Sequence, residues 1–201
     1  MRRPEWSLGV TAADVDRDPG AALDLRADAH LDDAWTARGF TEVVPGELVR
    51  PVLQQLVGLE QTHALGRRLG AGLRAGDVVV LSGPLGAGKT SLTQGIGAAL
   101  AVGGRVTSPS YVLARVHPGA VPLVHVDADR LREAGGRVEL DDLDLDSDLD
   151  ASVTVVEWGE GLAEALSDSW LEVHLERPPA GPGPEARTAL VVARGPRWSS
   201  P

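Results

Sequence analysis

The sequence has no cysteine, so none of its 201 residues can form a disulfide or a thiolate metal site. It also has no run of about 18 apolar residues, so a membrane-spanning helix is not expected. The charged start Met1-Arg2-Arg3 is not followed by the apolar segment of a signal peptide. We therefore expect a cytoplasmic protein that makes no contact with membranes.

Aromatic residues are scarce, at 3% of the chain, so the core has to be built from Val, Leu, Ile and Ala. Basic residues are fewer than acidic ones, 19 against 29, and the net charge is −10. A phosphate backbone repels such a surface, so we expect no DNA binding and expect a partner to make most contacts with any other nucleic acid. Simple solubility is an equally good explanation of the charge.

A phosphate-binding motif stands in the middle of the chain. Residues 83–90 read GPLGAGKT and match G-x-x-x-x-G-K-[ST] at every fixed position. An apolar run at 78–81 precedes the motif and a helical pattern over 90–101 follows it, as a P-loop requires. Backbone N–H groups of such a loop bind phosphates, its lysine reaches the β- and γ-phosphates, and its threonine binds Mg²⁺. The predicted nucleotide-binding residues of the loop are Gly83, Leu85, Gly86, Ala87, Gly88, Lys89 and Thr90.

The periodicity around this motif predicts an α/β fold, a P-loop NTPase with a mixed central β-sheet flanked by helices. Leu65, Leu69 and Leu73 recur every four residues, which predicts a helix capped by Thr62 and ended by Gly76. Further strands are expected at 111–116, 122–126, 153–157, 170–176 and 188–193. The last two are expected to form a hairpin across the Pro/Gly-rich segment 178–184. In the helix over 90–101, Gly95 and Gly97 are expected to allow close packing.

Three segments are predicted along the chain. Residues 1–52 form an N-terminal extension of unknown role, in which 39–44 could be a short strand. Residues 53–177 form the P-loop ATPase domain. Residues 178–201 comprise the Pro/Gly-rich loop and a C-terminal strand and tail.

Two acidic residues end predicted strands and are candidates for the chemistry. Asp127 follows the apolar run 123–126, and Glu157 follows 153–156 and precedes Trp158. A carboxylate in this position can hold Mg²⁺ or orient the attacking water. The alternatives are a solvated carboxylate at a strand end for Asp127, and a surface Glu beside a buried Trp for Glu157.

Four motifs in order resemble the bacterial TsaE family, formerly called YjeE. They are GPLGAGKTSLTQG at 83–95, TSPSY at 107–111, HVDADRL at 125–131 and EW at 157–158. The similarity covers about residues 56–177. One position departs from the family pattern: Asp129 stands where the family usually has Tyr before Arg130.

The resemblance implies a role for each matching residue. Lys89, Asp127 and Glu157 would be catalytic, and Thr90, Asp127 and Glu157 would hold the metal. Thr107 and Ser108 would belong to a switch-like loop beside the γ-phosphate. Trp158 would lie next to the site, and Glu160 would lie near the nucleotide. His125, beside the end of its predicted strand, could tune the site, and a packed strand histidine is an equally good explanation.

The family's activity implies ATP and Mg²⁺ as cofactors and larger proteins as partners. TsaE proteins help to make threonylcarbamoyladenosine beside the anticodon of tRNA. Their ATP hydrolysis, weak alone and stimulated by partners, would drive a cycle of a TsaD–TsaB complex that transfers the threonylcarbamoyl group. TsaD- and TsaB-like proteins would make most of the contacts with tRNA.

Two other functions remain open, and one metal site is not expected. The chain could be a P-loop kinase for a small molecule, with Arg130, Arg132 and Arg137 as a loose basic group, or a nucleotide-gated scaffold without turnover. The acidic segment 146–157 has partial EF-hand spacing, but Ala151 stands where the sharp turn requires Gly. We therefore expect a solvated acidic loop and no Ca²⁺ site.

Overall fold

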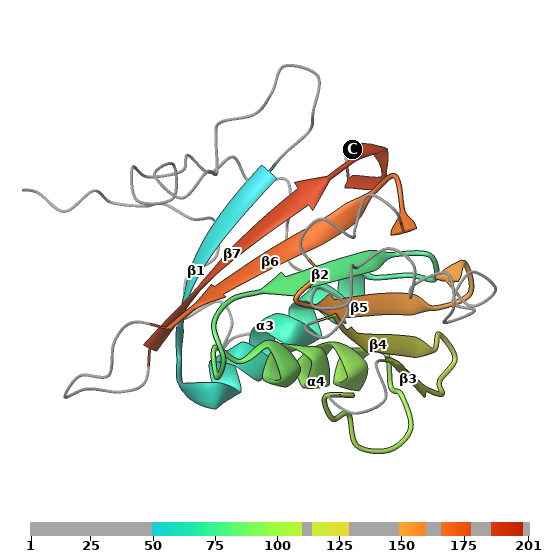
Figure 1. Ribbon diagram of the computed structural model, residues 1–201, viewed down its shortest axis with the longest axis horizontal. Coiled ribbons are helices and arrows are strands. Elements are labelled where there is room, and N and C mark those ends of the chain that lie inside the picture. Colours follow the sequence, from blue (N-terminus) through green and yellow to red (C-terminus); the bar gives the residue numbers. More distant parts are fainter. Residues whose placement is uncertain (1–49, 110–113, 129–148, 160–165, 178–185, 199–201) are drawn as a thin grey trace, which may run out of the picture.

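A seven-stranded sheet forms the centre of the computed structural model, which describes residues 50–109, 114–128, 149–159, 166–177 and 186–198 (Figure 1). Its strands lie in the order β1-β7-β6-β2-β5-β4-β3. Their bounds are β1 Arg50–Val57, β2 Val78–Ser82, β3 Ala114–His117, β4 Leu123–Asp127, β5 Val153–Glu157, β6 Trp170–Glu176 and β7 Ala186–Arg194.

The middle of the sheet is parallel and its edges are antiparallel. Strand β2 pairs in parallel with β5 and β6, and β4 pairs in parallel with β5. Strand β3 pairs antiparallel with β4, and the β6–β7 and β7–β1 pairs are also antiparallel. Every residue of β2 and β5 is buried, as continuous apolar runs in the centre of a parallel sheet predict.

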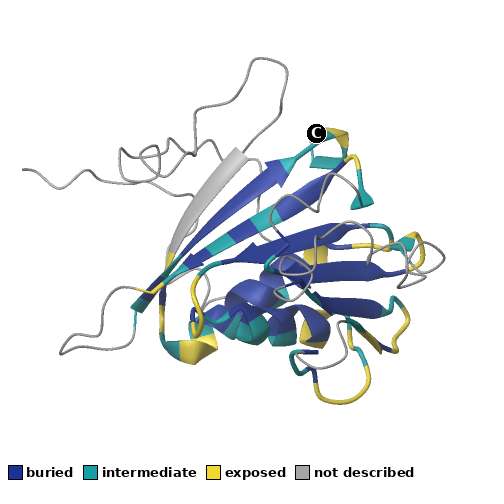
Figure 2. Ribbon diagram, in the orientation of Figure 1, coloured by how far each residue is buried: buried dark blue, intermediate teal, exposed yellow. Residues whose placement is uncertain are grey.

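Two helices, α3 (Gly58–Gly72) and α4 (Lys89–Ala99), lie on one face of the sheet (Figure 1). Their apolar stripes, which include Leu65, Leu69, Leu92 and Ile96, belong to the same buried cluster as alternate residues of the strands, such as Val79. Figure 2 shows that most of the central strands and much of the two helices are buried. No helix in the described parts of the chain combines the length and hydrophobicity that crossing a membrane requires.

Glycines allow α3 and α4 to pack closely against each other. A Cβ atom on Gly66 would lie 2.3 Å from the Leu92 carbonyl oxygen, and one on Gly95 would lie 2.3 Å from the His63 carbonyl oxygen. Side chains at these positions would therefore force the two helices apart. The expected close packing of Gly95 is confirmed, and a Cβ on Gly97 would lie 2.8 Å from the Val106 side chain.

The predicted bounds of the first helix are wrong at both ends. The helix begins at Gly58, with Val57 as its N-cap, and Thr62 lies inside it with its hydroxyl donating to the Gly58 carbonyl at 3.4 Å. It ends at Gly72, and Gly76 belongs to the following turn with a φ of +87°. The leucine spacing predicted the buried stripe, but a capping residue type does not by itself mark the first turn.

The predicted strands and the hairpin of β6 with β7 are confirmed, within a few residues at the ends. For the strand predicted over 111–116, the described part is Ala114–His117, and 111–113 lie outside the described residues. Strand β1 was not predicted. It pairs with β7 along eight residues and runs through the predicted boundary between 52 and 53. The possible strand over 39–44 lies outside the described residues.

Candidate nucleotide-binding site

The loop between β2 and α4 has the backbone of a phosphate-binding loop. Gly83, Gly86 and Gly88 have φ values of +131°, +77° and +107°, a region that L-residues with a side chain rarely occupy. At Gly83 a Cβ would lie 2.1 Å from the Leu175 carbonyl oxygen. Gly88 is the N-cap of α4 and provides no side-chain cap. The first N–H groups of α4 therefore face this loop, where an anion is favoured.

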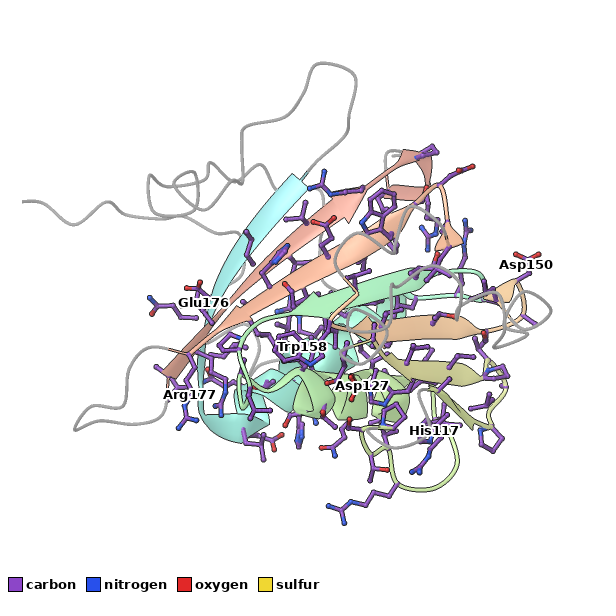
Figure 3. All side chains as sticks on the ribbon, viewed as in Figure 1. His117, Asp127, Asp150, Trp158, Glu176 and Arg177 are labelled. Carbon is purple, nitrogen blue, oxygen red and sulfur yellow. The ribbon has the colours of Figure 1, made fainter. Side chains whose placement is uncertain are left out.

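Lys89 is buried beneath the loop that it follows. Its Nζ donates to the carbonyl oxygens of Gly83 at 2.7 Å and Pro84 at 3.2 Å. The same atom lies 3.6 Å from the centroid of the Trp158 ring, a cation–π contact. Trp158 has a φ of +62°, unusual for a residue other than glycine, and its N–H donates to the Leu81 carbonyl. This backbone geometry brings the Trp158 ring next to the lysine, and Figure 3 shows Trp158 near Asp127.

Glu157, the last residue of β5, joins the loop to strand β4. Its Oε1 atom accepts a hydrogen bond from the Thr90 hydroxyl at 2.9 Å and lies 2.9 Å from Nε2 of His125. Glu157 and His125 are almost completely buried. A buried carboxylate is unfavourable without such partners, so these two contacts stabilise the position of Glu157.

Asp127 lies beside Glu157 because β4 and β5 are in register at these two residues. Its Oδ2 accepts a hydrogen bond from the Ser108 hydroxyl at 3.2 Å, so Ser108 ties the segment 105–109 to the end of β4. Thr107 accepts a hydrogen bond from Arg115 at 2.6 Å. Gln94 of α4 donates to the Val106 carbonyl at 3.0 Å, which ties the same segment to the helix. Arg115 and Gln94 were not among the predicted site residues.

The oxygen atoms at this edge suit Mg²⁺ that arrives with a nucleotide. Thr90, Asp127 and Glu157 offer one hydroxyl and two carboxylates, and Mg²⁺ in such sites takes its other ligands from phosphates and water. Within the described ranges, no group of three or more His, Cys, Asp or Glu side chains forms a metal cage of its own. The donor set therefore fits a metal that the phosphates help to hold.

The remaining predicted residues are placed as follows. Leu85 is 92% exposed at the tip of the loop, whereas Ala87 is buried. Glu160, Asp129 and Arg130 lie outside the described residues, as do Asp146 and Asp148 of the partial EF-hand spacing.

His117 lies behind the site, with its ring centroid 6.4 Å from that of His125. Burial, with smaller contributions from the charges of His125 and Arg115, lowers the pKa of His117 below its ordinary value of 6.5. The neutral form of His117 is therefore favoured at neutral pH.

A second polar network occupies the opposite face of the sheet. His174 of β6 forms a hydrogen bond with Ser82, the residue before the phosphate loop, and its Nε2 lies 3.4 Å from Glu172. Glu172 also accepts hydrogen bonds from Arg194 at 2.7 Å and Trp170 at 2.8 Å. Burial alone would raise the pKa of Glu172, but the three partners outweigh it and lower this pKa to about 2.

Comparisons with known proteins show what the chain is similar to. A family model described as "Threonylcarbamoyl adenosine biosynthesis protein TsaE" matches residues 56–182. A protein of Streptomyces coelicolor named tRNA threonylcarbamoyladenosine biosynthesis protein TsaE is 53% identical over 139 residues, which cover 68% of this chain and 93% of that protein. Its namesake from Mycobacterium tuberculosis H37Rv is 58% identical over 126 residues, 59% of this chain and 75% of that protein.

A solved structure has the same fold. The crystal structure of Bacillus subtilis YdiB superimposes with a TM-score of 0.60 at 28% sequence identity. The match covers 76% of this chain and 91% of YdiB. The mixed α/β sheet with flanking helices, predicted from the sequence, is therefore confirmed as a P-loop NTPase-like fold.

Proposed function

The chain belongs to the TsaE family, and from this premise we propose that it is the ATP-binding and ATP-hydrolysing component of tRNA threonylcarbamoyladenosine biosynthesis. The observation that carries the proposal is the hydrogen bond between Thr90 and Glu157 at the end of a complete phosphate loop. This bond places a carboxylate from β5 beside the threonine that P-loop proteins use for Mg²⁺.

The loop and Lys89 would hold the phosphates. Glycine N–H groups and the N-terminus of α4 would bind phosphate oxygens, and Lys89 would exchange its loop carbonyls for the β- and γ-phosphates. Mg²⁺, when bound, would neutralise charge that develops on the transferred phosphoryl group. A hydroxyl has one hydrogen and two lone pairs, so Thr90 can face the metal with a lone pair and still donate to Glu157.

Glu157 would act on the water that attacks the γ-phosphate. Its Oε1 accepts from Thr90 and lies beside His125, so the orientation of the carboxylate is fixed and its other oxygen can orient a water molecule. Asp127, adjacent in register, would hold the metal directly or through water.

A change in the bound nucleotide would be transmitted to the partners by a movement of the segment 105–109. Ser108 contacts Asp127, so a change at the metal side can move this segment. We propose that this movement drives the cycle of a TsaD–TsaB complex, which would make most of the contacts with tRNA. The net charge of −10 favours leaving RNA contact to the partners.

The decisive experiment measures ATP hydrolysis by the purified chain with Mg²⁺, alone and then with TsaD, TsaB and tRNA. We expect weak turnover alone, strong stimulation by the partners, and loss of that stimulation in Glu157→Ala with ATP binding retained. Lys89→Ala, Thr90→Ala and Asp127→Ala should impair binding of nucleotide or metal. Tight ATP binding without stimulation would indicate a scaffold, and a phosphorylated small molecule among the products would indicate a kinase.

A further inference from the structure

Two arginines lie against the phosphate loop on the side opposite Glu157. The loop follows β2, whose neighbours in the sheet are β5 on one side and β6 on the other. Glu157 and Trp158 come from the end of β5. Arg177 follows β6, and Arg187 is the second residue of β7.

Arg187 packs under the N-cap of α4. Its Nε lies 3.4 Å, and its Cδ 3.6 Å, from the position that a Cβ on Gly88 would occupy. The residue is only 6% exposed. It shares the strand face of Ala189, Val191 and Ala193, which pack in the core on the helix side of the sheet. A guanidinium that is fixed in this way lies at the N–H end of α4.

Arg177 approaches the same loop from its outer side. Its Nη1 lies 3.5 Å from the position of a Cβ on Gly86, and the side chain is exposed at the end of β6 (Figure 3). Strands β6 and β7 pair up to Glu176 and Thr188, so Arg177 and Arg187 are the next two residues in this register. Both side chains therefore lie next to glycines of the phosphate loop, one behind it and one beside it.

We propose that Arg187 and Arg177 are nucleotide-positioning residues, whose charges bind the polyphosphate of ATP from the β6–β7 side of the loop. Lys89 acts from within the loop and the arginines act from behind and beside it. The proposal rests on the proposed function, because it assumes that the loop binds a nucleotide. It adds two residues that lie outside the motif and that nothing in the local sequence marks.

The test is a competition assay in which ATP, ADP and AMP displace a fluorescent adenine nucleotide from the full chain. A charge acting on phosphates predicts that Arg187→Met weakens ATP binding by about tenfold, ADP binding by less and AMP binding least. Arg187→Lys should restore most of the affinity. Arg177→Met, at an exposed position, should weaken ATP binding by about threefold, and less as salt is raised.

The matched control is Arg194→Met, which removes the same charge from the same strand at its other end, where Arg194 contacts Glu172. Its ATP affinity should equal that of the parent chain.

Equal losses for ATP and AMP, or unchanged ATP affinity in Arg187→Met and Arg177→Met, would overturn the proposal. If Arg187→Met does not fold, Arg177→Met decides. Lys89→Ala distinguishes failure of the proposed function from failure of the proposed role of the arginines. If Lys89→Ala also binds ATP normally, the proposed function fails. If Lys89→Ala alone loses affinity for ATP, only the role of the arginines fails.

Discussion

Two glutamate–histidine pairs flank the strand that leads into the phosphate loop, one on each face of the sheet. Glu157 with His125 lies on the face that α3 and α4 cover, and Glu172 with His174 lies on the other face. Each pair also contacts a hydroxyl group at the loop: Thr90 follows the loop and bonds to Glu157, whereas Ser82 precedes it and bonds to His174.

The two glutamates differ in their partners. Glu172 lies within β6 and is surrounded by N–H donors of Trp170, His174 and Arg194, which keep it ionised. Glu157 lies at the carboxyl end of its strand, where ligands of parallel sheets bind, and one of its partners is the motif threonine. The same residue types therefore hold the sheet together in one place and lie at the proposed catalytic site in the other.

The two pairs should differ most in their effect on the rate of ATP hydrolysis when each glutamate is replaced by glutamine. Glu157→Gln removes the charge that, in our proposal, orients the attacking water, so we expect partner-stimulated ATP hydrolysis to fall by about 100-fold or more. Glu172→Gln should change the rate by less than about twofold, because its partners all lie within β6 and β7. Steady-state phosphate release with TsaD, TsaB and tRNA measures both. Equal loss in the two variants would contradict the comparison.

The free energy of unfolding should depend on the Glu172 pair. The folded pKa of Glu172 is about 2, below its ordinary value of 4.5, so its charge stabilises the fold above pH 4.5 and this contribution is lost as the pH falls toward 2. Arg194→Met removes one partner and should lower the free energy of unfolding at pH 7 by about 1–3 kcal/mol.

Urea unfolding at pH 7 and at pH 3.5 checks this prediction, and the difference between Arg194→Met and the parent chain should be smaller at the lower pH. A difference that does not depend on pH would show that Arg194 stabilises through packing alone.

The two histidines give a smaller contrast. His125 lies 2.9 Å from the carboxylate oxygen that Thr90 also contacts, so His125→Asn should reduce turnover by about tenfold with little change in ATP affinity. His174→Asn should leave turnover within about twofold, because its glutamate lies outside the site. Rates measured across pH 6–9 provide the second readout, and an unchanged pH profile in His125→Asn would argue for a structural role only.

The smallest contrast is between two serines. Ser108→Ala removes the hydrogen bond to Asp127, so the Mg²⁺ concentration for half-maximal hydrolysis should rise by about threefold. Ser82→Ala removes the contact with His174 and should leave the Mg²⁺ dependence unchanged. A Mg²⁺ titration of both variants decides, and an equal shift would mean that both serines act through the shape of the loop.

Local patterns predicted much of the fold. The all-apolar strand before GPLGAGKT and the leucine spacing of the first helix each depend on neighbours within a few residues. The first turn of α3 was misplaced because Gly58 begins the helix without a side-chain cap. Strand β1 was missed because RPVLQQLV does not alternate clearly. Its partner strand β7 also lies far along the chain, 129 residues from Val57 to Ala186 and 143 from Arg50 to Ala193, so the register was not readable.

By itself, the sequence determined the phosphate loop, the positions of the central strands along the chain and the family, because each is written in short contiguous segments. Only the tertiary structure decided which carboxylate meets which hydroxyl. Thr90 and Glu157 are 67 residues apart, and Ser82 and His174 are 92 apart. Their contacts depend on strand register and on the face that each side chain occupies, and a shift of one residue would turn every side chain of a strand to the other face.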